Sequence, residues 1–235
     1  MSRGWFYVVL LALALPGVVL PAAASPLPVP TAAAALPPGD PIAPDAARVL
    51  ALLAERNAAL EGYSFDLRVK IAMHTFPWLQ PYLIGSGTYE KPGRYSVAFR
   101  QVPALAKNYQ KVTGEMLDPS SWPEKYAVTV GRQDAADVEL ILHERVKGEI
   151  TEARATIDAV TGSVKRMRFL YEHGGTIEIV QHSTAMQGFV LPVTQDAEIA
   201  MPGFKATAHA TFSDYRLTVG RTGPAAGEHL VRNGT

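Results

Sequence analysis

The chain has 235 residues, no cysteine, and 22 basic against 22 acidic residues, so its formal net charge is zero. This length is enough for one sizeable β domain, since such domains often reach about 200 residues. Without cysteine the fold cannot depend on disulfides, nor can a lipid anchor sit on an N-terminal cysteine, so a hydrophobic core must hold the domain together. Neither a basic face for nucleic acid nor an acidic tail is evident, and we expect no nucleic-acid partner.

Residues 1–24 have the pattern of a secretory signal peptide. Arg3 supplies the positive charge, residues 5–15 form an unbroken apolar run, and Ala22-Ala23-Ala24 offers a cleavage site. The alternative is an uncleaved membrane anchor, but Pro16-Gly17 interrupts the apolar run before it reaches the roughly 20 residues that a spanning helix needs. We therefore expect an exported protein that is soluble and monomeric once this segment has been removed.

Residues 25–44 are rich in proline and alanine, which predicts a disordered tether, and residues 221–235 are expected to form a flexible tail. The strongest helix pattern covers residues 45–60, where Asp45 can cap the N-terminus and Gly62 ends the pattern. Its apolar side chains recur at helical spacing and are Val49, Leu50, Leu52, Leu53 and Leu60. We expect the side with Leu50, Leu53 and Leu60 to pack against a sheet.

A long series of strands follows this helix. Residues 63–73 alternate between apolar and polar side chains, and residues 83–90 and 94–100 form a predicted hairpin around Lys91-Pro92-Gly93. Further strands are expected at residues 126–130, 136–147, 151–158, 163–171, 176–182, 189–199 and 204–219. Because short glycine-containing turns separate them, the pattern predicts an antiparallel meander. The predicted fold is mainly β: one domain over residues 45–220, in which a curved antiparallel sheet wraps on the N-terminal helix.

Two segments interrupt the strand pattern. Residues 101–125 form either a functional lid or rim, or an ordered connection that covers one end of the sheet. Residues 76–82 contain two prolines, which exclude regular pairing. Their large side chains either rim a cavity or contact a membrane or partner, or else fold over the end of the sheet as a minor core. The candidate rim residues are Phe76, Trp78, Leu79, Tyr82 and Trp122.

No pattern of catalytic or metal-binding residues is present. None of the six histidines has the spacing of a zinc motif, and His74 and His209 alternate onto polar faces. Gly85-Ser86-Gly87 lies within a strand, whereas a nucleophile elbow needs a strand-to-helix turn, so its glycines are expected at a bulge or a close approach. We expect no catalytic residue, no metal, no cofactor and no enzyme activity. A hydrolase built from residues distant in sequence is the third-ranked alternative.

The order of motifs resembles the bacterial outer-membrane lipoprotein carrier family (LolA/LolB-like). The motifs are Tyr63-Ser64-Phe65, Gly85-x-Gly87-x-Tyr89 leading to Lys91-Pro92, Ile157-Asp158-x-x-Thr161-Gly162, Leu191-Pro192 and Phe212-x-Asp214-Tyr215, within residues 45–219. The resemblance implies a periplasmic protein with an unclosed antiparallel barrel, helices that plug the open side, and a cavity that receives acyl chains. It also places Lys91 where carrier members have a functional arginine.

The inner face of such a barrel is where we expect a ligand. Large side chains alternate there with alanines, which either leave volume for a ligand or let the helix approach closely. The expected lining residues are Phe65, Leu67, Val69, Tyr89, Lys91, Val97, Phe99, Leu140, Leu142 and Ala208. The first hypothesis is a carrier or chaperone for a lipidated protein or another amphiphile. The second is a non-catalytic envelope sensor or scaffold that binds a protein partner, such as an envelope membrane protein, through the aromatic loop.

Overall fold

The computed structural model describes residues 44–91, 94–100, 102, 111–115, 122–146 and 148–220. The expected signal peptide, the tether up to residue 43, most of the 101–125 segment and the tail lie outside the described residues. In chain order the elements are α2 (Pro44–Glu55), β1 (Leu60–Met73), β2 (Tyr82–Glu90), β3 (Arg94–Phe99), β4 (Lys111–Glu115), α3 (Trp122–Lys125), β5 (Tyr126–Gln133), β6 (Asp137–Glu144), β7 (Ile150–Asp158), β8 (Val164–Tyr171), β9 (Thr176–Met186), β10 (Phe189–Met201) and β11 (Phe204–Val219).

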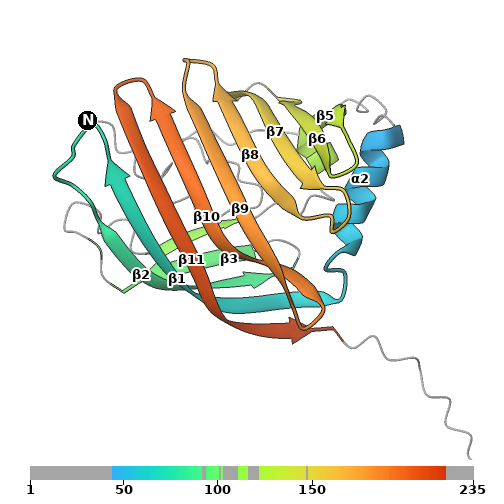
Figure 1. Cartoon of the computed structure of the whole chain (residues 1–235), viewed down its shortest axis with the longest axis horizontal. Coiled ribbons are helices and arrows are strands. Elements are labelled where there is room, and N and C mark those ends of the chain that lie inside the picture. Colours follow the sequence, from blue (N-terminus) through green and yellow to red (C-terminus); the bar gives the residue numbers. More distant parts are fainter. Residues whose placement is uncertain are drawn as a thin grey trace, which may run out of the picture.

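The described strands form one antiparallel sheet of eleven strands, in the order β4-β3-β2-β1-β11-β10-β9-β8-β7-β6-β5. Strands that follow one another in sequence pair with each other, except that β4 and β5 form the two edges. The first and last strands, β1 and β11, pair in the interior of the sheet. The sheet is strongly curved and not closed (Figure 1). This confirms the predicted fold class and most of the predicted meander.

Alternation along the strands gives the sheet a buried inner face and a polar outer face. In β2 every second residue is buried, and β1 follows the same rule from Phe65 to Met73. Gly87 lies opposite Phe65 in the ladder, and a Cβ atom at Gly87 would overlap the Phe65 ring. The expectation of a close approach at this glycine is therefore confirmed, because the aromatic ring occupies the space of the missing side chain.

Helix α2 covers one part of the inner face. Leu50 and Leu53 belong to the same buried core as the inward side chains of the strands. The Arg56 guanidinium donates a 2.8 Å hydrogen bond to the carbonyl of Gly162, which has a φ of 63° in the turn between β7 and β8. Figure 1 shows α2 beside the end of the sheet formed by β5–β8. The sheet thus packs on the helix at this end, which confirms the predicted wrapping in part.

The helix boundaries differ from the prediction. The helix begins at Pro44, which suits a first helical turn, and ends at Glu55, so Leu60 is the first residue of β1. The side-chain amide of Asn57 explains the early end, because it donates to the carbonyl of Val190 at 3.0 Å and accepts from the Val190 amide at 3.1 Å. These two hydrogen bonds fix the turn against β10, so the chain leaves the helical path after Glu55.

Two elements within residues 101–125 were not predicted. β4 pairs with β3 and forms an edge of the sheet, and the single turn of α3 precedes β5 directly. The sequence Lys111-Val-Thr-Gly-Glu115 contains a single large apolar residue, so it offers no alternation from which a strand could be predicted.

Candidate functional site

The inner face brings together most of the residues predicted to line a cavity. Eight of them share one buried core, each with at most 4% of its surface exposed: Phe65, Leu67, Val69, Val97, Phe99, Leu140, Leu142 and Ala208. Tyr89 belongs to the same core at 9% exposure. They come from β1, β2, β3, β6 and β11, which lie on both sides of the β1–β11 pair. The apolar surface therefore runs across nearly the whole inner face.

Small side chains on this face stand opposite large ones. Ala155 lies between Leu140 on β6 and Met167 on β8 in the ladder. Ala208 lies between Ile71 on β1 and Ala197 on β10. The alanines predicted to point inward are all buried: Ala153, Ala155, Ala206, Ala208 and Ala210. The short inward side chains therefore lie on two strands, Ala153 and Ala155 on β7 and the other three on β11.

An aromatic cluster occupies the end of this face near the turn that follows α2. Tyr63, Tyr89 and Tyr95 are cross-strand neighbours on β1, β2 and β3. The ring centroids of Tyr63 and Tyr89 are 5.0 Å apart, and the Tyr63 ring also lies 5.7 Å from that of Tyr215. The Tyr95 hydroxyl is buried and has no hydrogen-bond partner among the described residues. Burial raises the pKa of Tyr95 well above its ordinary value, and the nearby Tyr63 and Tyr215 raise it further, so this hydroxyl stays protonated.

A buried amide pair is a polar feature of the inner face that the sequence analysis missed. Gln181 and Gln195 are 7% and 1% exposed, and Gln195 Nε2 donates a 2.6 Å hydrogen bond to Gln181 Oε1. Gln181 Nε2 in turn donates to the carbonyl of Val164 at 3.3 Å. The signal was present in the sequence, because both glutamines occupy inward positions in strands that otherwise alternate regularly.

Lys91 stands apart from the other predicted lining residues. It follows β2, and its ammonium group donates to the backbone carbonyls of Asn57 and Ala58. These carbonyls belong to the turn between α2 and β1. The structure thus places the charged end of Lys91 on this turn and not among the apolar inner side chains.

The residues predicted to form a rim divide into three groups. Trp78 and Tyr82 are exposed, at 81% and 56%. Phe76 and Leu79 pack against the core and are only partly exposed. Trp122 is 1% exposed, so the prediction that it contacts a partner at a rim is wrong. Arg145 explains its burial, because the Arg145 side chain and backbone amide donate to the carbonyls of Pro123 and Lys125 and hold α3 against the sheet.

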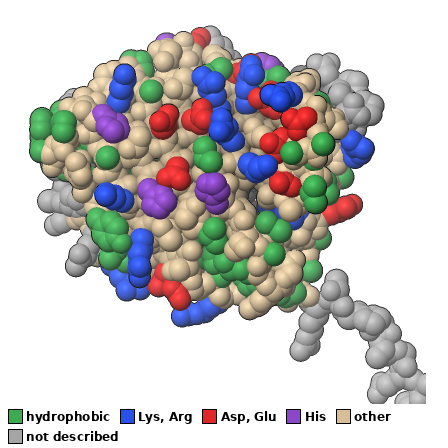
Figure 2. All heavy atoms as spheres, viewed as in Figure 1, with side chains coloured by type: hydrophobic (Ala, Val, Ile, Leu, Met, Phe, Trp, Pro, Cys, Tyr) green, Lys and Arg blue, Asp and Glu red, His purple; other side chains and the backbone are tan. Residues whose placement is uncertain are grey.

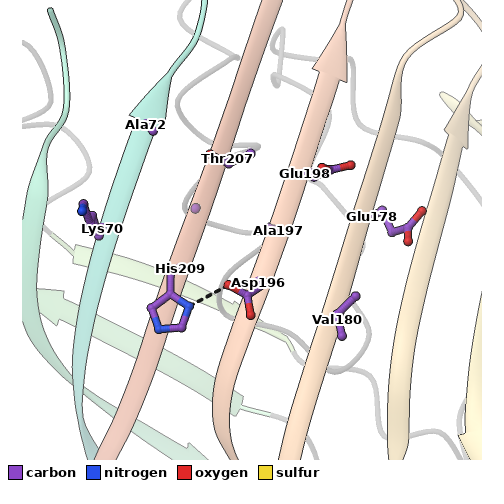
Figure 3. A pocket seen from close by; sticks show the side chains of 10 residues that line it. Lys70, Ala72, Glu178, Val180, Asp196, Ala197, Glu198, Thr207 and His209 are labelled. Atoms are coloured by element: carbon purple, nitrogen blue, oxygen red, sulfur yellow. Dashed lines mark hydrogen bonds and ion pairs between the residues drawn. The ribbon is translucent and has the colours of Figure 1, made fainter. Parts of the chain in front are cut away.

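The outer face carries a shallow groove with a volume of about 600 Å³ over β1, β11, β10 and β9 (Figure 3). Its lining is charged, with Lys70, Asp196 and Glu198 among the residues that form it. His209 Nδ1 lies 2.6 Å from Asp196 Oδ1, and both side chains are about half exposed. The predicted placement of His74 and His209 on the polar face is confirmed.

The groups of this groove that could act on a ligand are its charged side chains and the hydrogen-bonded His209–Asp196 pair. In the described part of the chain no group of three or more His, Asp or Glu side chains is placed to hold a metal ion. Within that same part, no helix is both long enough and apolar enough to cross a bilayer.

Comparison with known sequences gives no match, because neither a protein-family model nor a curated protein sequence matches this chain significantly. Comparison of structures identifies similar folds. A domain assigned to outer membrane lipoprotein sorting, from Vibrio parahaemolyticus, has a TM-score of 0.55 and 11% sequence identity, over 77% of this chain and 95% of its own. A LolA superfamily protein from Nitrosomonas europaea has a TM-score of 0.55 and 9% identity, over 74% of this chain and 93% of its own.

A DUF1329 family protein from Desulfovibrio piger has the same TM-score of 0.55 at 9% identity, over 74% of this chain and 94% of its own. At such low identity the similarity concerns the fold. The chain therefore has the LolA-like fold of lipoprotein-sorting domains, as the order of its sequence motifs predicted.

Proposed function

We propose that this chain is a periplasmic carrier or chaperone that holds the acyl chains of a lipidated protein, or of another amphiphile, against the inner face of its unclosed sheet. The observation that carries the proposal is the continuous apolar inner face, with short side chains such as Ala208 and Ala210 opposite large ones. The similarity of fold to a domain named for lipoprotein sorting supports it.

The driving force for such binding is the removal of apolar surface from water. Each buried methylene group contributes about 0.8 kcal/mol, so one acyl chain provides ample free energy for binding without any chemical step. No catalytic residue or cofactor is required, and we propose that the protein is not an enzyme. The signal-peptide pattern of residues 1–24 supports export to the periplasm and a soluble mature protein.

A fluorescent fatty-acid probe tests this function directly. We expect the wild-type protein to bind the probe, and Ala208→Trp to weaken binding by at least about tenfold while the fold persists, because the indole fills the space of the ligand. Ala72→Trp is the matched control, since Ala72 lies on the outer face of the neighbouring strand β1 and should leave binding unchanged.

A filled, ligand-free core predicts the opposite result. In that case the wild type binds no probe, and Ala208→Trp overpacks the interior and destabilises the fold by about 1–3 kcal/mol. Mass spectrometry of organic extracts from the purified protein gives a second readout, because a carrier should retain some of its cargo. If the fluorescence of fatty-acid probes of several chain lengths does not rise on addition of the wild-type protein, the carrier proposal is wrong.

The second candidate function is a non-catalytic envelope module that binds a protein partner. Lys91 favours this second candidate, because its ammonium group is hydrogen-bonded to the carbonyls of Asn57 and Ala58 and does not lie among the inner side chains that would contact a ligand. Such a module would need no ligand space on the inner face. Loss of probe binding together with retained capture of an envelope protein would support this candidate.

A further inference from the structure

Three large apolar side chains are exposed together at one corner of the sheet. Trp78 is 81% exposed, Tyr82 56% and Ile84 39%, and all three lie within seven residues at the start of β2. We call these three residues the aromatic corner. Single exposed apolar residues are common in soluble proteins, but three large ones exposed within one loop and the strand that follows it mark a candidate interaction site.

The loop that carries Trp78 is held in an ordered turn. The amide of Phe76 donates to the carbonyl of Met73 at 3.2 Å, and the amide of Leu79 donates to the carbonyl of Phe76 at 2.9 Å. Phe76 and Leu79 pack on the core, and the Phe76 ring meets the Trp78 ring edge-on, with centroids 5.7 Å apart. The same loop that buries two of its apolar side chains therefore presents the largest one to the outside.

Basic side chains surround the aromatic corner. In the β1–β2 ladder, Arg68 stands opposite Ile84 and Lys70 stands opposite Tyr82. The amide of Arg100 bonds to the carbonyl of Ile84, and the amide of Lys205 bonds to the hydroxyl of Thr75 in the loop. All four side chains, Arg68, Lys70, Arg100 and Lys205, are exposed, and none of them forms an ion pair with another described residue.

The sequence carries the same asymmetry of charge. Residues 67–114 contain seven Lys or Arg residues and a single acidic residue, Glu90, although the whole chain is neutral. This local excess was not apparent from the net charge. In Figure 2 hydrophobic and basic side chains lie close together at the edge of the molecule where Figure 1 places β1 and β2, whereas acidic and basic side chains are mixed over the other strands.

We propose that the aromatic corner and its four basic neighbours form a docking surface for an anionic lipid bilayer. Indole and phenol rings prefer the interface between hydrocarbon and headgroups, and exposed Lys and Arg side chains are attracted to anionic headgroups. A protein partner is the poorer fit, because a stable protein interface buries about 800 Å² on each side around an apolar centre, and only three apolar side chains project here. The proposal does not depend on what the inner face binds.

Vesicle sedimentation tests the proposal on the purified protein without residues 1–24, because the apolar run of residues 5–15 would itself enter a bilayer. We expect binding to vesicles of phosphatidylcholine with about one third phosphatidylglycerol, and at least about tenfold weaker binding to phosphatidylcholine alone or in high salt. The double variant Trp78→Ala/Tyr82→Ala should lose binding about tenfold. Val160→Ala is the matched control, because Val160 is also 81% exposed but lies in the β7–β8 turn at the opposite end of the sheet.

The basic residues have their own control. Lys70→Gln/Lys205→Gln should weaken binding to the anionic vesicles and reduce its salt dependence, whereas Arg132→Gln, at an exposed position on β5, should do neither. Equal binding to neutral and anionic vesicles would overturn the role of the basic residues. Binding that survives Trp78→Ala/Tyr82→Ala would overturn the role of the aromatic corner.

Tryptophan fluorescence gives a readout that needs no destabilising variant. The difference between the spectra of the wild type and Trp78→Phe isolates Trp78, while Trp122 is buried and should not respond. We expect the Trp78 emission to shift to the blue when anionic vesicles are added. If it does not shift and no vesicle is bound, the proposal is wrong, and a protein partner or a second copy of this chain becomes the occupant to test. Acyl-probe binding can succeed or fail independently of either result.

Discussion

Lys91 shows how a residue singled out by resemblance can have a local role in the structure. The ammonium group of lysine offers three donors, and two of them reach the carbonyls of Asn57 and Ala58 in the turn between α2 and β1. The Lys91 side chain therefore links the end of β2 to the turn that follows the helix. A sequence comparison can identify the position, but it cannot show which groups the side chain meets, because Asn57 and Lys91 are 34 residues apart.

Tyr95 leads to the first prediction, which concerns a buried hydroxyl group to which no described residue is hydrogen-bonded. Tyr95→Phe removes that hydroxyl and leaves the packing of the ring in place. We expect the free energy of unfolding to stay unchanged or to rise by about 1 kcal/mol, since a buried unpaired polar group is unfavourable. Urea denaturation followed by circular dichroism measures the difference.

Tyr215→Phe is the matched comparison within the same aromatic cluster. The Tyr215 hydroxyl donates a 2.7 Å hydrogen bond to the carbonyl of Pro192, so its removal should destabilise the fold by about 1 kcal/mol. If Tyr95→Phe instead lost as much stability as Tyr215→Phe, the Tyr95 hydroxyl would have a partner in solution.

Among the elements, the helix shows where a local pattern misleads. Leu60 fits the helical spacing of Leu53 and also the alternation of the strand that follows, and both patterns predict a buried side chain. Tertiary contacts decide between them, because the Asn57 amide bonds to Val190, 133 residues away. Strand positions with a buried face were predictable, whereas β4 and α3 depend on neighbours that a local pattern does not contain.

The second prediction concerns the packing of α2. Leu53 is 4% exposed within the core, so Leu53→Asp places a charge without a partner in an apolar environment. We expect a loss of about 3–5 kcal/mol in the free energy of unfolding, enough to unfold a marginally stable domain. Thermal unfolding followed by circular dichroism is the measurement.

Ala51→Asp provides the control on the same helix. Ala51 is exposed, so the same charge should lower the stability there by no more than about 1 kcal/mol, which is mainly the lower helix propensity of aspartate. Equal midpoints for Leu53→Asp and the wild type would contradict the packing of α2 on the inner face.

For the whole molecule, the sequence predicted the strands and their antiparallel succession but not which distant strands meet. The β1–β11 pair joins residues near the two ends of the domain, for example Leu67 with Phe212, and no local signal specifies that register. In the candidate site, too, some features were predictable from the local sequence and others depend on contacts between distant segments. Alternation placed the inward side chains correctly, but the burial of Trp122 and the position of Lys205 beside the loop that carries Trp78 arise only when separate segments come together.

The third prediction follows from the central position of β11. This strand pairs with β1 on one side and with β10 on the other, and it supplies Ala206, Ala208, Ala210 and Phe212 to the core. A chain truncated after residue 203 would leave both neighbours with unpaired edges and an open inner face. We expect it not to fold cooperatively, since the two halves of the sheet would have no common strand.

Truncation after Gly220 is the matched control, because it keeps β11 complete and removes only the segment that the sequence predicts to be a flexible tail. We expect its unfolding midpoint to equal that of the full chain, while the shorter chain shows no cooperative transition and is digested rapidly by a protease at low concentration. A chain ending at residue 203 that unfolds cooperatively would mean that β10 can pair with β1, or that each half of the sheet folds alone. Either result would show that β11 is not required to connect the two halves of the sheet.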